Sequence, residues 1–449
     1  MTSSFSLFSD LKERINSHDA KAMTIGLGYV GLPMALTIHE AGFPTLGFDI
    51  NETRVDAINA GERVISYFPE TRISDAVASG KFAATSDPAK LAEMDVILIC
   101  VPTPLGADRE PDLTYVIKAT EQIAEHLRPG QLVVLESTVW PGATSGVVKP
   151  ILERGGLRAG TDFFIGFSPE REDPGNDTHT TRTIPKVVGA DDKASRDLLE
   201  LFYGKIVDKP VPVSSSAVAE AVKLTENSFR TVNIALINEM KAAFDAMGVD
   251  VWEVVNAAAT KPFGYMPFYP GPGIGGDCIP VSPAYLSWRA RDVGSCTPII
   301  DLARTTNETA PDAIAARVVA GLMTKSGVSV SNARLLILGV AYKKDVEDTR
   351  ESPALSALIR LEEMGAKCDY HDPYFPVMPM TRDHPSLAGR KSVALSADQL
   401  AGYDAVVVLT DHTEVDYPLV AANAKLLFDS RNVFDGKSVP VNRENFIKI

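Results

Sequence analysis

The sequence lacks any hydrophobic run long enough to cross a membrane, since its longest apolar stretches, such as VILIC and AVVVL, have the length of a strand. It also lacks an excess of positive charge, and its formal net charge of −14 argues against nucleic acid or an anionic membrane as the main partner. The first residues, MTSSFSLFSDLKERINSHD, contain no uninterrupted apolar segment typical of a signal peptide. We therefore expect a cytoplasmic protein that binds neither nucleic acid nor membranes.

Cysteine is scarce, with 4 residues in 449, and none of them shows CxxC or zinc-like spacing. A cytoplasmic chain of this size does not need disulfides, so we expect neither a metal site nor a disulfide framework. Cys100 ends DVILIC and Cys368 lies in AKCDY, which predicts that both are small buried residues of strands. Cys278 differs, because it lies in the glycine- and proline-rich loop FYPGPGIGGDCIP.

The order of apolar patterns predicts an α/β protein with two Rossmann-like, doubly wound parallel sheets. The first βαβ unit runs through AMTIGLG, a helix at about 30–41 and TLGFDI, and the same alternation resumes after residue 332. Between them, residues 216–247 contain no glycine or proline and predict one long helix. We expect an N-terminal Rossmann domain at 1–212, a helical domain with the cysteine loop at 213–310, and a C-terminal Rossmann-like domain at 311–449.

The segment GLGYVG closes the first predicted strand and opens a helix, as a dinucleotide-binding turn does. Gly26 allows the tight turn, Gly28 lets a pyrophosphate approach the backbone, and Gly31 allows close helix–strand packing. The next strand ends at Asp49, whose carboxylate can accept hydrogen bonds from ribose hydroxyls, which favours NAD over NADP. Arg54 could contact the cofactor phosphate or adenine, or be a solvated helix charge.

Lys223 and Asn227 lie four residues apart on the predicted long helix and share one face. Alone, such a pair is typical of a polar stripe exposed to water. The nearby glycine loop, which would present Cys278 on a shaped rim, instead indicates a covalent acyl-transfer site with an ammonium and a carboxamide in reach. The residues thus predict that Cys278 is a nucleophile.

Several motifs in order resemble the UDP-glucose/GDP-mannose dehydrogenase family, the nucleotide-sugar 6-dehydrogenases. They are IGLGYVGLP, VPTP, ESTVWPG, FSPERE, KLTENSF, GPGIGGDCIP and GVAYKKDVEDTRESPAL, and together they cover nearly the whole chain. SPEREDPGN and AYKKDVEDTRESPAL look most like the UDP-N-acetylhexosamine branch, particularly UDP-N-acetylglucosamine 6-dehydrogenases.

The resemblance implies that C6 of a nucleotide-linked hexose is oxidised to a uronic acid. This four-electron oxidation would use two NAD⁺ and pass through a thiohemiacetal and then a thioester on Cys278. Lys223 and Asn227 would stabilise the developing oxyanion, and Thr138 and Glu170 would position or deprotonate a water. Thr138 could instead be a helix cap, and Glu170 a surface charge.

Further roles are implied by position in the matching motifs. The C-terminal domain would hold UDP, and the long helix would build a homodimer. The cofactor residues would be Gly26, Gly28, Tyr29, Val30, Gly31, Asp49, Arg54, Thr103, Thr138 and Arg350. The substrate residues would be Glu170, Arg171, Lys223, Asn227, Tyr269, Gly273, Gly275, Lys343 and Arg431.

The chain departs from the family beside the cysteine. Relatives commonly have an aspartate four residues after the nucleophile, and hexosamine-type relatives often a histidine just before it, where this chain has Ser282 and Asp277. Ser282 can still donate and accept hydrogen bonds in the catalytic set. We hypothesise that Asp277 restores part of the missing charge; the alternative is a solvated Asp277 and a cap-like Ser282.

Two other classes of function stay open at this point. A two-electron NAD-dependent dehydrogenase of the β-hydroxyacid type shares a lysine/asparagine pair on a helix but does not need Cys278. A non-catalytic NAD-binding sensor would need none of the three residues. Within the favoured family, UDP-glucose and UDP-N-acetylmannosamine are the alternative substrates.

Overall fold

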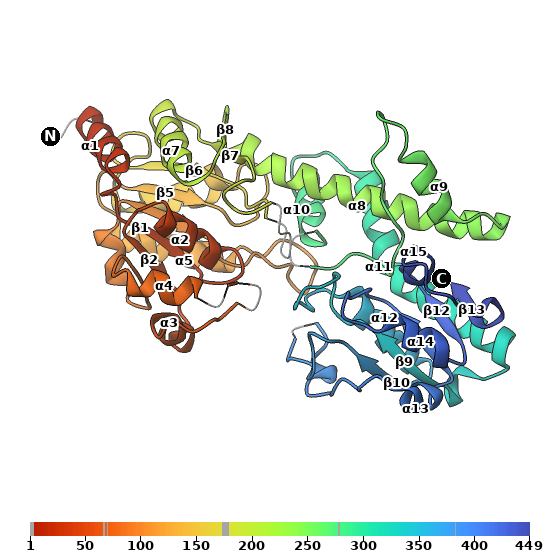
Figure 1. Cartoon of the computed structure of the whole chain (residues 1–449). Coiled ribbons are helices and arrows are strands. Elements are labelled where there is room, and N and C mark those ends of the chain that lie inside the picture. Colours follow the sequence, from red (N-terminus) through yellow and green to blue (C-terminus); the bar gives the residue numbers. More distant parts are fainter. Residues whose placement is uncertain (1–3, 66–67, 70, 173–178, 277–278, 382) are drawn as a thin grey trace. The chain divides into compact units, whose positions relative to one another are not determined.

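A computed structural model of the chain describes residues 4–65, 68–69, 71–172, 179–276, 279–381 and 383–449 (Figure 1). The chain divides into two compact units. The first unit contains residues 1–226 and 284–296, and the second contains residues 227–283 and 297–449. Each unit is built on its own sheet.

The first unit contains an eight-stranded sheet in the order β3-β2-β1-β4-β5-β6-β7-β8. Neighbouring strands pair in parallel, except that β7 runs antiparallel to β6. The strands are β1 (Ala22–Ile25), β2 (Thr45–Phe48), β3 (Phe82–Thr85), β4 (Val96–Ile99), β5 (Leu132–Leu135), β6 (Phe164–Phe167), β7 (Lys186–Gly189) and β8 (Pro210–Val213). The edge position of β8 explains how a strand of sequence PVPV can contain two prolines.

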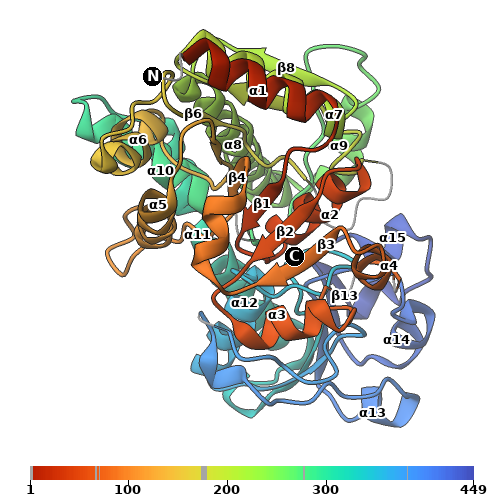
Figure 2. The ribbon, with the colours of Figure 1, turned by 90° about the vertical axis from the view of Figure 1, so that its left-hand side faces the viewer.

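Helices cover both faces of this sheet, since its central strands are apolar at every position and both of their faces must be shielded from water. The strands VILI and LVVL are buried at all positions, as expected for a parallel sheet covered on both sides. Helices α1 and α7 pack side by side, as the two views show (Figures 1 and 2). Helices of this unit include α1 (Ser4–Asn16), α2 (Gly31–Glu40), α3 (Glu52–Asn59), α4 (Arg72–Ala78), α5 (Thr114–His126), α6 (Lys149–Leu152) and α7 (Lys193–Ile206).

The second unit contains a five-stranded, fully parallel sheet in the order β10-β9-β11-β12-β13. Residues alternate across it: Leu335 and Ile337 belong to one buried cluster, and Leu336 and Leu338 to another. Both faces are therefore covered, and the predicted fold class is confirmed. The strands are β9 (Arg334–Leu338), β10 (Lys367–His371), β11 (Ala405–Val408), β12 (Leu427–Asp429) and β13 (Phe446–Lys448).

The predicted long helix is confirmed as α8 (Ser216–Met247), which begins in the first unit and continues in the second. No helix in the described ranges is long and apolar enough to cross a membrane. Cys100, just after β4, and Cys368, in β10, are buried as predicted. The remaining helices are α9 (Val251–Ala258), α10 (Val281–Asp292), α11 (Pro298–Gly321), α12 (Pro353–Glu363), α13 (Ala397–Ala401), α14 (Tyr417–Asn423) and α15 (Val433–Gly436).

Candidate active site

The three glycines of the turn between β1 and α2 have different reasons to be glycine. Gly26 has φ +90°, and a Cβ there would lie 2.7 Å from the carbonyl oxygen of Cys100. A Cβ on Gly31 would lie 1.9 Å from the carbonyl oxygen of Gly26. At Gly28, by contrast, the nearest atom to such a Cβ is Nη1 of Arg54, 4.0 Å away. The fold itself requires Gly26 and Gly31, whereas Gly28 leaves room against the helix N-terminus that fits a pyrophosphate.

Asp49 follows β2 and holds this turn in place. Its Oδ2 accepts a 2.9 Å hydrogen bond from the amide of Leu27, and its Oδ1 accepts one of 2.9 Å from the amide of Asn51. Because a carboxylate offers about four acceptor positions, both oxygens can still accept from ribose hydroxyls. The guanidinium of Arg54 donates to the carbonyl of Leu27 at 3.0 Å, so it lies against the glycine turn. These residues could hold NAD.

Other predicted cofactor residues lie at the same edge of the sheet, after the carboxyl ends of its strands. Tyr29 is exposed and Val30 is half-buried at the start of α2. Thr103 follows β4, and its carbonyl accepts a hydrogen bond from the hydroxyl of Tyr285 at 3.1 Å. Thr138 follows β5 and is half-buried. Ligands of open α/β sheets bind at this edge.

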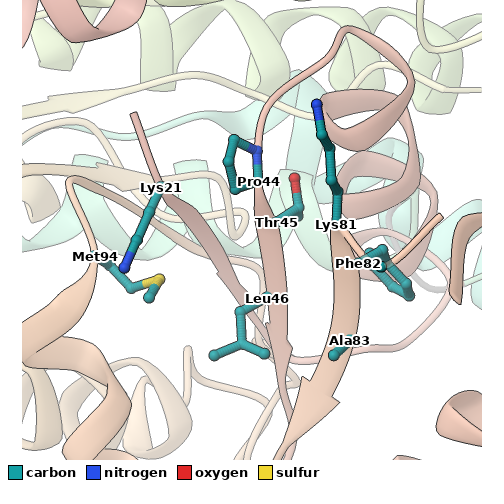
Figure 3. A pocket seen from close by; sticks show the side chains of 9 residues that line it. Lys21, Pro44, Thr45, Leu46, Lys81, Phe82, Ala83 and Met94 are labelled. Carbon is teal, nitrogen blue, oxygen red and sulfur yellow. The ribbon is translucent and has the colours of Figure 1, made fainter. Parts of the chain in front are cut away.

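A hollow of about 230 Å³ lies at the opposite edge, where β1, β2 and β3 begin (Figure 3). It is lined by Lys21, Pro44, Thr45, Leu46, Gly80, Lys81, Phe82, Ala83 and Met94. Because nucleotides bind at the carboxyl ends of parallel strands, this hollow does not belong to the cofactor site.

Glu170 follows β6 and is paired with Lys186. Its Oε2 accepts a 3.0 Å hydrogen bond from Nζ of Lys186, and its Oε1 accepts the amides of Arg171 at 2.7 Å and Glu172 at 2.6 Å. Burial alone would raise the pKa of Glu170, but Lys186, and then Lys223, outweigh it and hold that pKa below its ordinary value. Glu170 is therefore a carboxylate in a mostly buried setting, not a surface charge.

The guanidinium of Arg171 is engaged within the first unit. Its Nε and Nη2 donate to the carboxylate of Glu226 at 3.3 and 2.6 Å, and its Nη1 donates to the carbonyl of Pro185 at 2.6 Å. This fork ties the segment after β6 to α8. Its substrate role stays a prediction.

Lys223 and Asn227 are both buried on α8, which argues against a solvent-exposed polar stripe. The amide Nδ2 of Asn227 donates to Oγ of Ser282 at 2.8 Å. Ser282 is fully buried in the first turn of α10. Cys278 and Asp277 lie outside the described residues, so the nucleophile and the proposed charge compensation stay predictions.

The glycines of the cysteine loop pack against the second unit's own chain. A Cβ on Gly271 would lie 2.4 Å from Nη1 of Arg431, and one on Gly275 would lie 2.6 Å from Cβ of Tyr342. Gly273, with φ +134°, faces Pro353, and the amide of Gly276 donates to the carbonyl of Arg350 at 2.9 Å. The loop is thus rich in glycine because it lies directly on the segment 342–353 and on Arg431.

The remaining predicted substrate and cofactor residues of this unit have contacts of their own. Tyr269 stacks on Trp252, with ring centroids 5.2 Å apart. Lys343 is half-buried in the loop after β9. Arg350 pairs with Asp348, its Nη2 lying 2.7 Å from Oδ2. Nε of Arg431 donates to Oδ1 of Asp411 at 3.2 Å.

Three buried polar residues around Glu170 were not among the predicted site residues: Glu136, Lys186 and Tyr203. Glu136 stands in VVLEST and Lys186 in IPKVVG, so each is a charge joined to an apolar strand. That pattern could have been noticed, because charged residues are almost never fully buried unless paired.

Comparison with known proteins decides the family. Models of the UDP-glucose/GDP-mannose dehydrogenase family match the chain at 20–207 for the NAD-binding domain, 217–309 for the central domain and 336–439 for the UDP-binding domain. A UDP-N-acetyl-D-glucosamine 6-dehydrogenase of Pseudomonas aeruginosa is 35% identical over 401 residues, covering 88% of this chain and 91% of that one. The chain belongs to this family.

Other relatives agree with this assignment. A UDP-N-acetyl-D-mannosamine dehydrogenase of Pyrococcus horikoshii is 34% identical over 424 residues, covering 93% of this chain and 96% of that one. The solved structure of the UDP-D-ManNAc dehydrogenase from Pyrococcus horikoshii matches with a TM-score of 0.84 at 31% identity, over 95% of this chain and 98% of the other. The protein is an NAD-dependent UDP-sugar dehydrogenase, which confirms the predicted enzyme class and cofactor.

Proposed function

We propose that this dehydrogenase oxidises the C6 hydroxyl of a UDP-N-acetylhexosamine to the uronic acid, with UDP-N-acetylglucosamine as the favoured substrate. The product would be a precursor for polysaccharide or glycan synthesis. Relatives named for UDP-N-acetyl-D-glucosamine and for UDP-N-acetyl-D-mannosamine support the hexosamine branch, at 35% and 34% identity. UDP-N-acetylmannosamine is therefore the second candidate substrate.

The observation that carries the proposed chemistry is that Glu170 is hydrogen-bonded to Lys186 and feels the positive charge of Lys223. Asn227 and Ser282, on α8 and α10, are buried and hydrogen-bonded to each other. NAD⁺, when bound, accepts a hydride in each of two oxidations. Lys223 and Asn227 offer a cation and an N–H donor to the oxygen at C6 as it gains negative charge. The thiol of Cys278 adds to the aldehyde, so that a thiohemiacetal forms and no free aldehyde is released.

Hydrolysis completes the reaction. Water adds to the thioester carbon while Glu170 accepts one of its protons, the carbon–sulfur bond breaks, and Cys278 leaves as the thiolate. Thr138 would help to position that water. The overall change consumes one water and two NAD⁺ and gives the carboxylate, two NADH and three protons.

We propose three functional domains with boundaries at 1–212, 213–310 and 311–449, which bind NAD, carry the catalytic cysteine and bind UDP. Lys343, Arg350 and Arg431 would contact phosphates or the nucleotide, and Tyr269, Gly273, Gly275 and Arg171 would line the sugar. We also propose a homodimer, because α8 and α11 expose large apolar side chains: Phe229 at 47%, Leu236 at 51%, Ile299 at 70% and Leu302 at 67%.

A substrate panel tests this function. UDP-glucose, UDP-N-acetylglucosamine, UDP-N-acetylgalactosamine, UDP-N-acetylmannosamine and GDP-mannose are each supplied with excess NAD⁺, and NADH released per sugar consumed is counted. Two NADH per UDP-N-acetylhexosamine supports the proposal. One NADH indicates a two-electron dehydrogenase, and a preference for UDP-glucose overturns the choice of branch.

A further inference from the structure

Strand β7, which runs antiparallel to β6, brings a lysine to the edge of the sheet where β1 to β6 end. In the register of β6 and β7, Phe167 pairs with Gly189. Continuing that antiparallel register toward the start of β7 puts Lys186 opposite the segment that carries Glu170. A parallel strand would have put its first residue at the other edge. The reversed direction of β7 thus explains why the ammonium of Lys186 lies 3.0 Å from Glu170.

Lys186 also pairs with a second carboxylate, which is held by a hydrogen bond of its own. Its Nζ lies 3.3 Å from Oε2 of Glu136, the residue after β5. The other oxygen of Glu136 accepts a hydrogen bond from the hydroxyl of Tyr203, on α7. The side chain of Lys186 is 3% exposed and that of Glu136 is fully buried. Burying ions is costly unless they are paired and hydrogen-bonded, and this cluster satisfies both conditions.

The charges of Glu136, Glu170 and Lys186 are balanced only when Lys223 is counted with them. Burial raises the pKa of Glu136, and Lys186 opposes that rise. With Glu136 and Glu170 both ionised, the two carboxylates and Lys186 have a net charge of −1. Lys223, on α8, acts electrostatically on Glu170 as a second cation. Glu136 and then Glu170 outweigh burial and raise the pKa of Lys186, so this lysine stays charged.

Hydrogen bonding to Glu170 favours its ionised form. Within the described part of the chain, Glu170 accepts hydrogen bonds from two backbone amides on Oε1 and from the ammonium of Lys186 on Oε2. A carboxylate has about four acceptor positions, so Oε2 keeps one for a further donor such as water. Protonation of Glu170 would use that last position on Oε2 and would weaken the charge-assisted bond from Lys186.

We propose that Lys186 and Glu136 are positioning residues that hold Glu170 as an oriented, ionised acceptor, so that it takes a proton from the hydrolytic water and does not act as an acid. The proposal rests on the function proposed above and deepens it. Lys186 orients Oε2 of Glu170 through their hydrogen bond. Glu136, itself hydrogen-bonded to Tyr203, holds the ammonium of Lys186 in place.

The pH dependence of turnover separates this role from a merely structural one. The groups that face Glu170 or its cation are Lys186, Lys223, Glu136, Glu172 and the buried Cys100. Lys186→Met removes the nearest cation, so the pKa of Glu170 rises and the acid limb of the kcat profile moves up by about one to three pH units. Glu136→Gln removes an anion and keeps an acceptor for Tyr203, so the same limb moves to lower pH.

The experiment records kcat, KM for the UDP-sugar and the Kd for NAD⁺ across pH for wild type, Lys186→Met, Glu136→Gln and Glu170→Gln. Opposite movement of the acid limb in the first two variants, with the Kd for NAD⁺ unchanged, supports the proposal. An unmoved limb in a Lys186→Met protein that binds NAD⁺ overturns it, as does movement in the same direction in both. If Lys186→Met does not fold, Glu136→Gln decides alone, since a limb that stays or rises overturns the proposal.

Glu170→Gln distinguishes the two levels of the hypothesis. If that variant turns over at the wild-type rate, the function proposed for Glu170 fails, and the positioning role fails with it. If Glu170→Gln is slow in the hydrolytic step while Lys186→Met keeps the wild-type profile, only the positioning role is wrong.

Discussion

The side-chain amide of Asn227 donates a 2.8 Å hydrogen bond to the hydroxyl oxygen of Ser282, and both residues are buried. The bond fixes the rotamer of Asn227 relative to the first turn of α10. It also gives Ser282 a defined role at a position where relatives commonly have an aspartate, namely to accept a hydrogen bond from Asn227.

Ser282→Ala removes that acceptor, so the N–H of Asn227 loses a buried partner at a cost of about 1–3 kcal/mol. We expect kcat to fall roughly ten-fold, since a donor to the C6 oxygen is no longer held in place. Ser282→Asp keeps an acceptor and is the matched control, with activity nearer to wild type. Steady-state kinetics decide, and a fully active Ser282→Ala would show that the hydrogen bond serves only packing.

The acid limb of the Ser282→Asp profile tests the hypothesis about Asp277 as well. If Asp277 supplies the charge that the aspartate of relatives supplies, Asp277→Asn moves a limb of the profile and Ser282→Asp moves it back in the double variant. If neither substitution moves a limb or the hydrolytic rate, the compensation hypothesis is wrong.

Gly28 and Gly31 form a matched pair for testing the cofactor turn. Gly28→Ala adds a methyl group whose nearest neighbour is 4.0 Å away, so the protein should fold and bind NAD⁺ at least about ten-fold more weakly. Gly31→Ala would bring Cβ to 1.9 Å from the carbonyl oxygen of Gly26, so it should destabilise the first unit. Thermal unfolding and NAD⁺ titration check both. Normal NAD⁺ affinity in Gly28→Ala would remove this turn from the cofactor site.

We expect Asp49 to set the preference for NAD over NADP. Asp49→Asn removes the negative charge that repels a 2′-phosphate and keeps one acceptor for the turn. The ratio of kcat/KM with NAD to kcat/KM with NADP should therefore fall roughly ten-fold. Asp49→Ala also loses the hydrogen bonds to the amides of Leu27 and Asn51, so it should weaken both cofactors. An unchanged ratio in both variants would place Asp49 outside the site.

The sequence predicted the elements whose signals are local. The glycine turn at 26–31, the long helix at 216–247 and the strands VILI and LVVL follow from spacing and apolar pattern, and each is present in the structure. The fold class needed nothing further, because alternating strands and helices can bury both faces of a sheet only in this way.

The reversal of β7 could not be predicted in the same way, because strand direction depends on pairing and not on local pattern. Without knowledge of that reversal, the sequence IPKVVG shows Lys186 only as an isolated charge next to an apolar strand. The contacts of the glycines in the cysteine loop were not predicted either: Gly271 and Gly275 face Arg431 and Tyr342, which follow them by many residues in the sequence. Long-range contacts of this kind are the part of the site that spacing does not reveal.

Cys278→Ser tests the covalent step. An alkoxy ester is a poorer acyl intermediate than a thioester, so the variant should release at most one NADH per sugar and stop at the aldehyde or a bound adduct. Trapping with a hydrazine reagent and mass spectrometry of the protein identify that species. Release of two NADH per sugar at the wild-type rate would contradict the nucleophile assignment.

His412 and Asp372 hold the loop that carries Lys343. The amide of Asp345 donates to Nδ1 of His412 at 3.0 Å, so the proton of the neutral ring lies on Nε2, which contacts Oδ2 of Asp372 at 3.0 Å. The same carboxylate accepts the amide of Val340 at 2.7 Å. Asp345 has φ +56°, a conformation that a non-glycine residue adopts only when its surroundings fix it.

Asp372→Asn should therefore loosen this loop without unfolding the sheet. The new NH₂ group would face N–H donors, so the amides of Val340 and Asp345 should lose protection in hydrogen exchange. If Lys343 contacts the substrate, KM for the UDP-sugar rises by roughly ten-fold while the Kd for NAD⁺, which reports on the first unit, does not change. His412→Asn is the companion variant. It should lower the hydrogen-exchange protection of the Asp345 amide but not that of the Val340 amide. Lost protection with an unchanged KM would remove Lys343 from the substrate site, and unchanged protection would show that Asp372 does not hold the loop.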